Sequence, residues 1–278
     1  MKHITAIISG KGGVGKTMLA AAFGLAEARR GKRVLLLDLD MGMGNLDLAL
    51  GLSPKYSMLG LVMGKCREKD AVQHVKDGPD FLAAHFKRDW RDIKKSDVAK
   101  VLEDYADDYD LILLDCPAGR GKGMEFAAKF ADSFILVIGP SKAAVINAKR
   151  TAQMLPEANI RAVYNDFSAD GTYTFEEAKE AVKSIPFGGI VPHSEEIDRL
   201  LQEGRMAEYD ETSPFGRAIA LCLDSAETGE TISPEVISEL LETGTKSAKK
   251  ADTESFLHPA SRLHRARLSA RYGRRGMR

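Results

Sequence analysis

Cysteine is scarce in this 278-residue sequence, and long apolar runs are absent. The three cysteines, Cys66, Cys116 and Cys222, form no Cys-x-Cys or Cys-x-x-Cys pair, and the six histidines show no metal-ligand spacing. This pattern excludes a disulfide framework, indicates a reducing compartment and argues against a carrier of metal clusters. Because there is no run of about 18 apolar residues and no signal peptide, we expect a soluble, cytoplasmic protein.

Net charge is also lacking, although the charges are unevenly distributed along the chain. The 40 basic and 40 acidic residues give a formal net charge of zero. Residues 244–278 contain ten Lys or Arg and two acidic residues, a net charge of +8, which leaves −8 for residues 1–243. We therefore predict a folded domain over residues 1–243 and a basic, flexible tail over residues 244–278.

The most informative stretch that is present is glycine-rich and covers residues 9–17. It follows an apolar, strand-like run at residues 4–8 and precedes residues 18–25, whose Ala and Leu content is typical of a helix. Gly10, four further residues and then Gly15-Lys16-Thr17 form the phosphate-binding loop pattern in its strand-loop-helix context. The stretch therefore predicts a site for a nucleoside triphosphate.

The chemistry of such a loop assigns a role to each residue type. Glycines let backbone N–H groups turn toward a polyphosphate, next to the partial positive charge of a helix N-terminus. Lys16 is expected to reach the β- and γ-phosphates, and the Thr17 hydroxyl to bind a magnesium ion that bridges them. We expect the nucleotide to be held by Gly10, Lys11, Gly12, Gly13, Val14, Gly15, Lys16, Thr17 and Met18.

Further apolar runs alternate with helical patterns along the chain. We expect buried strands at residues 33–37, 111–114, 134–138 and 160–164, and helices at residues 143–154, 195–202 and 214–224, among others. This alternation predicts an α/β fold, a mostly parallel, doubly wound sheet with helices on both faces. Ligands of such sheets bind beyond the carboxyl ends of the strands, which is where Gly10, Asp38, Asp40, Asp115 and Asn165 fall.

Two of these acids are candidates for the hydrolysis of the nucleotide. Asp115 follows four apolar residues and fits the acid that holds the magnesium shell as the partner of Thr17. Asp40 is the candidate for positioning the attacking water and the third residue, with Thr17 and Asp115, that we predict for the magnesium site, whereas Asp38 is expected to be structural. Lys11 adds a second charge to a loop that already has Lys16, so we expect it to act across a dimer on the other subunit's nucleotide.

These motifs together resemble the deviant Walker A ATPases of the MinD/ParA family. Lys11 matches the signature lysine of that family, and the segments at residues 38–47 and 115–119 match the loop after its second strand and its second switch. The MinD branch, including the relatives that set flagellar number, fits better than ParA. The resemblance implies that Asn165 reads adenine and that Pro192 lies beside the base. Departures from the pattern occur at three positions, namely Met18 in place of a threonine and Gly44 and Asp166 in place of basic residues.

The resemblance implies a magnesium-dependent ATPase with the P-loop NTPase fold. Its ATP-bound homodimer would engage an activator or cargo protein, and hydrolysis to ADP and phosphate would release it, thereby positioning a cell-division, flagellar or other cargo complex. The alternative is a ParA-like DNA or plasmid partition ATPase, for which DNA retention would survive deletion of residues 244–278. A nucleotide-binding module without hydrolysis is disfavoured, because Lys11, Lys16, Thr17, Asp40 and Asp115 are all present.

The basic tail leaves three interpretations open. Leu263, Ala266 and Ala270 share one face of a helix drawn through it, whereas Leu268 and Tyr272 point nearly the opposite way, so the apolar stripe is thin. The charge favours peripheral binding to anionic membrane at the inner face of the cell membrane, at about 1 kcal/mol per basic residue. Nucleic acid would attract the same charges and is the less favoured partner, and the third interpretation is a solvated tail without a ligand.

Overall fold

The structure is a computed structural model of the chain. It describes residues 3–40, 44–83, 94–105, 107–119, 121–155, 158–167, 173–230 and 235–236. These residues belong to one compact unit that extends to Leu241. The tail predicted for residues 244–278 lies outside the described residues, and so does most of the segment 234–241, which we expect to close the domain.

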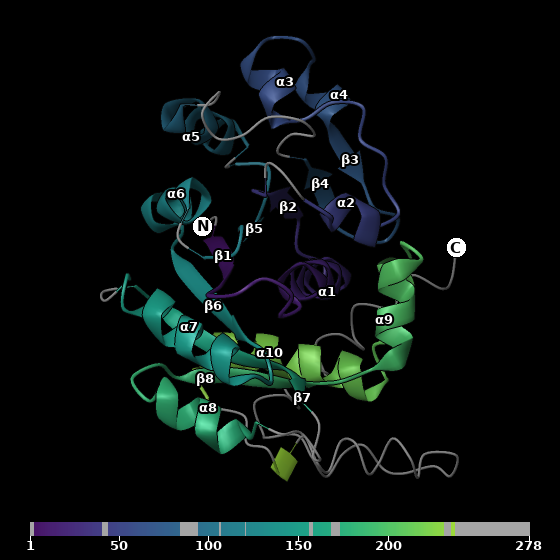
Figure 1. The fold of residues 1–278 in the computed structure, drawn as a ribbon. Helices are drawn as coiled ribbons and strands as arrows, with labels where there is room; N and C mark the ends of the chain where they lie inside the picture. The colour runs from purple at the N-terminus through teal and green to yellow at the C-terminus, as the bar shows by residue number, and fades with distance from the viewer. Residues whose placement is uncertain are drawn as a thin grey trace. The chain divides into compact units, whose positions relative to one another are not determined.

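A single eight-stranded sheet organises this unit, with the strand order β3-β4-β2-β5-β1-β6-β7-β8 (Figure 1). The strands are β1 (His3–Ser9), β2 (Val34–Asp38), β3 (Val72–His74), β4 (Asp80–Leu82), β5 (Leu111–Asp115), β6 (Ser133–Ile138), β7 (Ile160–Phe167) and β8 (Phe187–Pro192). All neighbouring pairs are parallel except β3 and β4, which are antiparallel. The predicted mostly parallel sheet is thereby confirmed, with β1 and its loop at the centre.

Helices cover both faces of the sheet, as predicted for a doubly wound fold (Figure 1). They are α1 (Lys16–Arg29), α2 (Leu46–Ala49), α3 (Met58–Val62), α4 (Glu68–Ala71), α5 (Lys95–Asp104), α6 (Lys122–Phe130), α7 (Lys142–Ala152), α8 (Phe175–Ala181), α9 (Glu195–Gln202), the 3₁₀ turn η2 (Met206–Glu208) and α10 (Pro214–Thr228). Buried side chains of α1 and α10 share one core with one face of the sheet, and those of α5 to α8 share a second core with the other face. Of the helices in the described ranges, none is both long and apolar enough to cross a bilayer.

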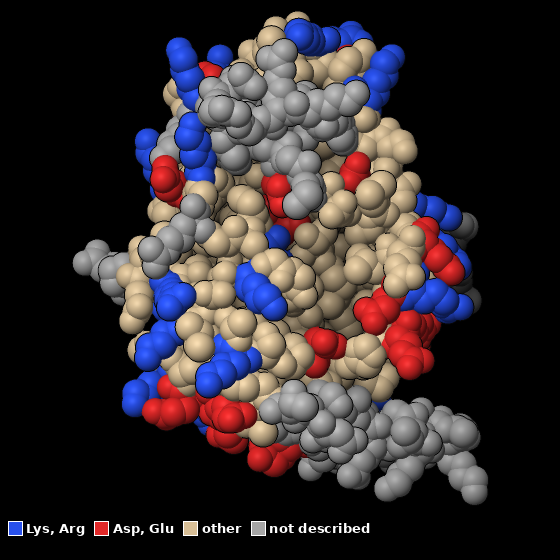
Figure 2. All heavy atoms as spheres, in the orientation of Figure 1, with Lys and Arg blue, Asp and Glu red and all other residues tan. Residues whose placement is uncertain are grey.

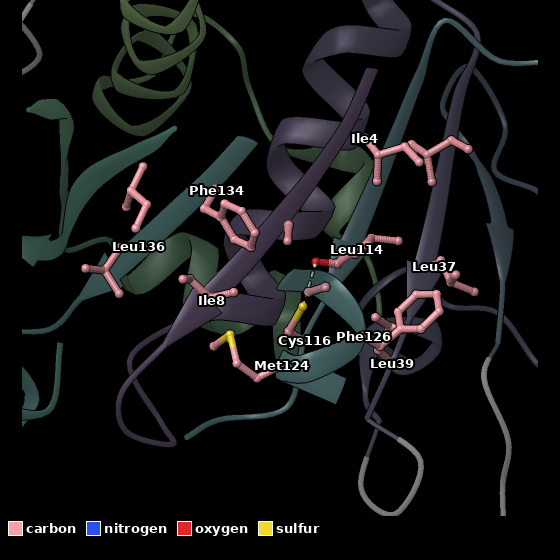
Figure 3. Close-up of a cluster of buried hydrophobic side chains, with 14 of the residues drawn as sticks. Ile4, Ile8, Leu37, Leu39, Leu114, Cys116, Met124, Phe126, Phe134 and Leu136 are labelled. Atoms are coloured by element: carbon pink, nitrogen blue, oxygen red, sulfur yellow. Dashed lines mark hydrogen bonds between the residues drawn. The ribbon is translucent and has the colours of Figure 1, made fainter. Parts of the chain in front are cut away.

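The central strands are apolar along their whole length because both of their faces are covered. Every residue of β2 and β5 is buried, which explains why their sequences are continuous runs rather than alternating patterns. Figure 3 shows one of the two cores, where Ile8, Leu114 and Leu136 from three strands meet Met124 and Phe126 of α6. Complete burial of a leucine such as these contributes roughly 1.5–3 kcal/mol to folding.

Several elements differ from the sequence-based expectation in extent or existence. Helix α1 begins at Lys16 and continues to Arg29, whereas the pattern indicates residues 18–25 only. Helix α6 and the short elements α4 and β3 were not expected at all. Strand β3 is a short, half-exposed edge strand. Its conformation is determined by pairing with β4 and not by an apolar pattern of its own.

Candidate active site

The phosphate-binding loop runs from the end of β1 to the first turn of α1. Gly13 and Gly15 adopt φ angles of 75° and 84°, which lie in the left-handed region where a side chain would cost roughly 1–2 kcal/mol. Gly15 is also the N-cap of α1, so the positive end of the helix dipole begins at the loop. The loop is held from within by Ser9, whose buried hydroxyl donates a hydrogen bond of 3.0 Å to the carbonyl oxygen of Lys11.

Gly10 is required for a different reason, which is close packing. A Cβ atom at Gly10 would lie 2.2 Å from the carbonyl carbon of Asn147, in helix α7. The loop backbone therefore packs directly against the backbone of α7. A Cβ atom at Gly12, by contrast, would meet no atom within 4 Å. Gly10 is thus required for packing, whereas the space next to Gly12 is open.

Lys16, Thr17 and Asp115 form a tight cluster beneath the loop. The Lys16 ammonium lies 2.7 Å from Oδ1 of Asp115, and the Thr17 hydroxyl donates a hydrogen bond of 2.7 Å to Oδ2. The Asp115 side chain is only 2% exposed, so its charge is compensated by Lys16 rather than by water. The structure thus brings together the phosphate-binding lysine and two of the three residues that we predicted for magnesium, Thr17 and Asp115, whereas the third, Asp40, lines the cleft.

The donor atoms of this cluster fit a magnesium ion. Mg²⁺ prefers hard oxygen ligands such as the Thr17 hydroxyl and the Asp115 carboxylate, and it usually retains several waters in addition to phosphate oxygens. In the described part of the chain, there is no group of three or more His, Cys, Asp or Glu side chains that could hold a metal by itself. An ion at Thr17 and Asp115 would therefore depend on a bound phosphate for further ligands.

Asp38 ends strand β2 and Asp40 follows it, and the two acids lie in different surroundings. Asp38 is buried, and its carboxylate accepts hydrogen bonds from the backbone N–H groups of Asp40 (2.8 Å) and Leu46 (3.4 Å). Burial, followed by the negative charge of Asp115, raises the pKa of Asp38 to about 7. Asp38 therefore shapes the loop, while Asp40 faces the cleft.

The glycine that replaces the expected basic residue after this strand also has a steric explanation. A Cβ atom at Gly44 would lie 2.4 Å from Oδ2 of Asp38 and 2.9 Å from the carbonyl oxygen of Asp40. The N–H of Gly44 donates a hydrogen bond to that same carbonyl. In this arrangement of the loop, no side chain fits at position 44.

The segment after β5 is the one that the family resemblance predicts to be the second switch. The N–H of Gly119 donates a hydrogen bond of 3.0 Å to the carbonyl oxygen of Ser9, which ties the segment to the end of β1. Cys116 is completely buried, and burial together with the charge of Asp115 raises the pKa of its thiol far above the usual value. It contacts the Leu114 carbonyl in the core of Figure 3, so it acts as a small packing residue and not as a nucleophile.

These elements enclose a cleft of about 850 Å³ at the carboxyl edge of the sheet. Figure 2 shows this face hollowed near its centre, where a basic side chain lies beside acidic ones. Of the residues predicted from the sequence, the cleft is lined by Gly12, Gly13, Val14, Gly15, Lys16, Thr17, Met18, Asp40, Asn165 and Pro192. Gly10 lies behind the loop, Asp115 lies beneath it, and Lys11 is exposed.

Asn165 connects the end of β7 to the phosphate-binding loop. Its Nδ2 donates a hydrogen bond of 3.0 Å to the carbonyl oxygen of Val14, and a Cβ atom at Gly15 would lie 2.1 Å from that nitrogen. The residue is 4% exposed, and its Oδ1 is buried without a hydrogen-bond partner in the described structure. Because buried acceptors are nearly always paired, this atom indicates a ligand group that donates a hydrogen bond.

Sequence reasoning missed part of the cleft wall. The additional lining residues include Asn45, Leu48, Ala118, Pro140, Asp166, His193, Ser194, Ile197 and Leu201. Asn45 and Ala118 belong to the motif segments at residues 38–47 and 115–119, although we assigned them no role, and most of the others are ordinary residues that no motif marks. Asp166 was noted only as a departure from the family pattern, and His193 could have been noticed because it directly follows Pro192, a predicted base-site residue.

The fold and the site together define the class of this protein. A strand-loop-helix phosphate motif at the carboxyl edge of a parallel sheet, with a buried aspartate on a neighbouring strand contacting its Lys and Thr, is the nucleotide site of a P-loop NTPase. Residues 5–207 match the family model described as the CobQ/CobB/MinD/ParA nucleotide binding domain, and the chain therefore belongs to this family.

Similar proteins confirm that the chain is a MinD-like member of the family. The septum site-determining protein MinD of Bacillus subtilis is 30% identical over 255 residues, which cover 86% of this chain and 94% of that protein. The MinC:MinD cell division protein complex of Aquifex aeolicus aligns with a TM-score of 0.72 and 30% identity, over 83% of this chain and 98% of that chain. MinD complexed with Mg-ADP from Pyrococcus horikoshii OT3 aligns with a TM-score of 0.72 and 25% identity, over 82% and 97%.

Proposed function

We propose that this chain is an ATP-dependent switch, which hydrolyses ATP to ADP and phosphate and thereby controls the positioning of a cargo complex. The observation that carries the proposal is the gathering of four groups at one cleft. The phosphate-binding loop and Asp40 line the cleft, and Lys16 and Thr17 both contact the buried Asp115 beneath it. The similarity to a MinD that binds Mg-ADP supports adenine nucleotides and magnesium as the ligands.

Each group of the cluster has a defined task in phosphoryl transfer. The loop N–H groups and the Lys16 ammonium bind and neutralise the β- and γ-phosphates, and magnesium supplies positive charge between them when it is bound at Thr17. Asp115 orients the Thr17 hydroxyl, and the two side chains would together help to hold the ion. Asp40 accepts a hydrogen bond from the attacking water and holds it toward the γ-phosphate, which is the acid's catalytic role.

Lys11 extends the proposal from a single subunit to a homodimer. Its side chain is exposed, whereas that of Lys16 is only 10% exposed and is paired with Asp115. An exposed cation on the phosphate-binding loop is suited to contact the nucleotide of a second subunit across the cleft mouth. Dimerisation would then depend on the γ-phosphate, and hydrolysis would separate the subunits and release the partner.

The partner is proposed from the relatives and from the charge of the tail. MinD in the complex from Aquifex aeolicus is bound to MinC, which supports an activator or cargo protein as a partner of this chain. The +8 charge of residues 244–278 supports peripheral binding to anionic membrane. We propose a cell-division, flagellar or related cargo, which is engaged by the ATP-bound dimer.

The enzymatic part of the proposal is tested by phosphate release. We expect ATP turnover that requires magnesium, and we expect Asp40→Ala to lower it by at least about 100-fold, because general base catalysis contributes about 10² to 10⁴. Binding of a fluorescent ATP analogue should be retained. Asp108→Ala, an exposed acid at the opposite edge of the sheet, serves as the control. Unchanged turnover in Asp40→Ala would remove this residue from the mechanism.

A further inference from the structure

Asp166 and His193 form a pair at the wall of the nucleotide cleft that none of the sequence motifs explains. Nδ1 of His193 lies 2.8 Å from Oδ1 of Asp166, and both residues line the cleft beside Asn165 and Pro192. Their side chains are 49% and 50% exposed. The MinD resemblance predicts a basic residue at position 166, so the pair is a departure of this chain from that pattern.

The backbone of strand β7 is shaped to present this pair. The pairing register of β7 with β8 shifts between Tyr164 and Phe167, so Asn165 and Asp166 form an irregular segment at the end of the strand. Asp166 adopts a φ of 63°, in the left-handed region that few residues other than glycine and Asn or Asp tolerate. The N–H of His193 donates a hydrogen bond of 3.0 Å to the Phe167 carbonyl, which fixes the two chain segments against each other.

The pairing determines which hydrogen-bonding atom His193 offers to the cleft. An ionised carboxylate can only accept, so Nδ1 of the imidazole carries the hydrogen and donates it to Asp166. In the neutral ring, Nε2 is then an acceptor, and the half-exposed His193 side chain lines the cleft. The same wall contains a second acceptor, the buried Oδ1 of Asn165, which has no hydrogen-bond partner in the described structure.

We propose that the Asp166–His193 pair determines base specificity, with Asp166 as a positioning residue that holds Nε2 of His193 as an acceptor for the exocyclic amino group of adenine. This inference rests on the proposed function. Adenine presents an N6 amino donor, whereas hypoxanthine and guanine present an O6 acceptor at that position. Two acceptors in one wall therefore favour adenine, whose N6 amino group can donate to them. With hypoxanthine or guanine, O6 would face these acceptors without a hydrogen bond and would be repelled by them.

The test compares the affinities of Mg-ADP and Mg-IDP, which differ at position 6 of the base, by titration calorimetry. We expect the unmodified chain to bind ADP at least about tenfold more tightly than IDP, since one such hydrogen bond discriminates by about 1–3 kcal/mol. His193→Phe should weaken ADP binding by about tenfold and leave IDP binding within about twofold. Asp166→Asn should lower the ADP/IDP ratio in the same direction, because it retains the left-handed backbone but its amide can also donate to Nδ1, so Nε2 is no longer fixed as the acceptor.

A matched control exists in the same chain. His74 and Asp80 form a pair of equal length, 2.8 Å between Nδ1 and Oδ1, on strands β3 and β4 and outside the cleft. His74→Phe should leave both affinities unchanged. The inference is overturned if the unmodified chain binds ADP and IDP equally. It is also overturned if His193→Phe and Asp166→Asn leave the ratio of the ADP and IDP affinities unchanged, as they would if both nucleotides were weakened equally. If the unmodified chain binds neither nucleotide, the proposed function itself fails.

Discussion

At the residue scale, two lysines of one loop are distinguished by their surroundings. Lys16 is largely buried and paired with Asp115 at 2.7 Å, whereas Lys11 is exposed five residues earlier. We expect the buried lysine to bind the phosphates of its own subunit. The exposed Lys11 does not pair with Asp115. Its position on the loop would let it contact a nucleotide bound to a second subunit.

The role of Lys11 is tested by Lys11→Ala. We expect this variant to fold and to bind ATP, because the side chain is exposed and packs into no core. We expect the ATP-induced dimer to be lost, since the charge of the partner's phosphates would no longer be neutralised. Light scattering measures the dimer, and Lys76→Ala, another exposed lysine, is the control. An unchanged dimer in Lys11→Ala would refute the action across the interface.

The residues of the phosphate-binding loop were predictable because the requirement is local. Glycine at positions 13 and 15 follows from left-handed backbone angles, and Lys16 and Thr17 follow from a fixed spacing. Asp166 and His193 were not predictable as a pair, because their contact depends on an irregular register between β7 and β8. Such a contact between residues that are far apart in sequence has no signature in either segment alone.

At the element scale, the carboxyl ends of helices α2 and α9 pack against each other through two glycines. Gly51 follows α2 and Gly204 follows α9, both with left-handed φ angles of 67° and 68°. A Cβ atom at Gly51 would lie 2.4 Å from the Gly204 carbonyl oxygen, and one at Gly204 would lie 2.7 Å from the Leu48 carbonyl oxygen. The contact holds together α2, which follows Asp40, and α9, which follows Pro192. Residues of both helices line the cleft.

The importance of this contact is tested by Gly204→Ala. We expect it to lower the free energy of unfolding by about 1–3 kcal/mol more than Gly64→Ala does, because overpacking costs about that much. Gly64 is the matched control, since its φ is 64° and a Cβ atom there would meet no atom within 4 Å, so Gly64→Ala introduces only the backbone strain. Urea unfolding measures both variants. Equal destabilisation would show that the contact between α2 and α9 contributes nothing beyond that strain.

The sequence predicted the sheet better than its accessory elements. The buried runs of β2, β5 and β6 identify parallel strands because both faces of such a strand must be apolar. Helix α6 was missed because it follows the glycines at 119 and 121 and contains Gly123, a composition that favours a loop. Burial of Met124 and Phe126 in the core outweighs that local preference.

At the scale of the whole molecule, the charge is divided between the domain and the tail. Residues 1–243 carry −8 and residues 244–278 carry +8. A tail of this charge would be attracted to anionic surfaces, whereas a domain of net negative charge would be repelled by them. Association with such a surface should therefore depend on the tail.

This division is tested by pelleting with anionic liposomes and, separately, with DNA, each with ATP or ADP. We expect the full chain to pellet with liposomes in ATP and a chain truncated after Thr243 to remain in the supernatant, because about 1 kcal/mol per basic residue is lost. Raising the salt concentration should release the full chain. DNA retention by the truncated chain would instead favour the partition ATPase.

The central claim is that ATP controls assembly of two subunits, and the molar mass of Asp40→Ala in solution tests it most directly. Slow hydrolysis in this variant should preserve the ATP state during size-exclusion chromatography with light scattering. We expect twice the 30.3 kDa of one chain in Mg-ATP and the single-chain mass in Mg-ADP. The same mass in both nucleotides would contradict the account.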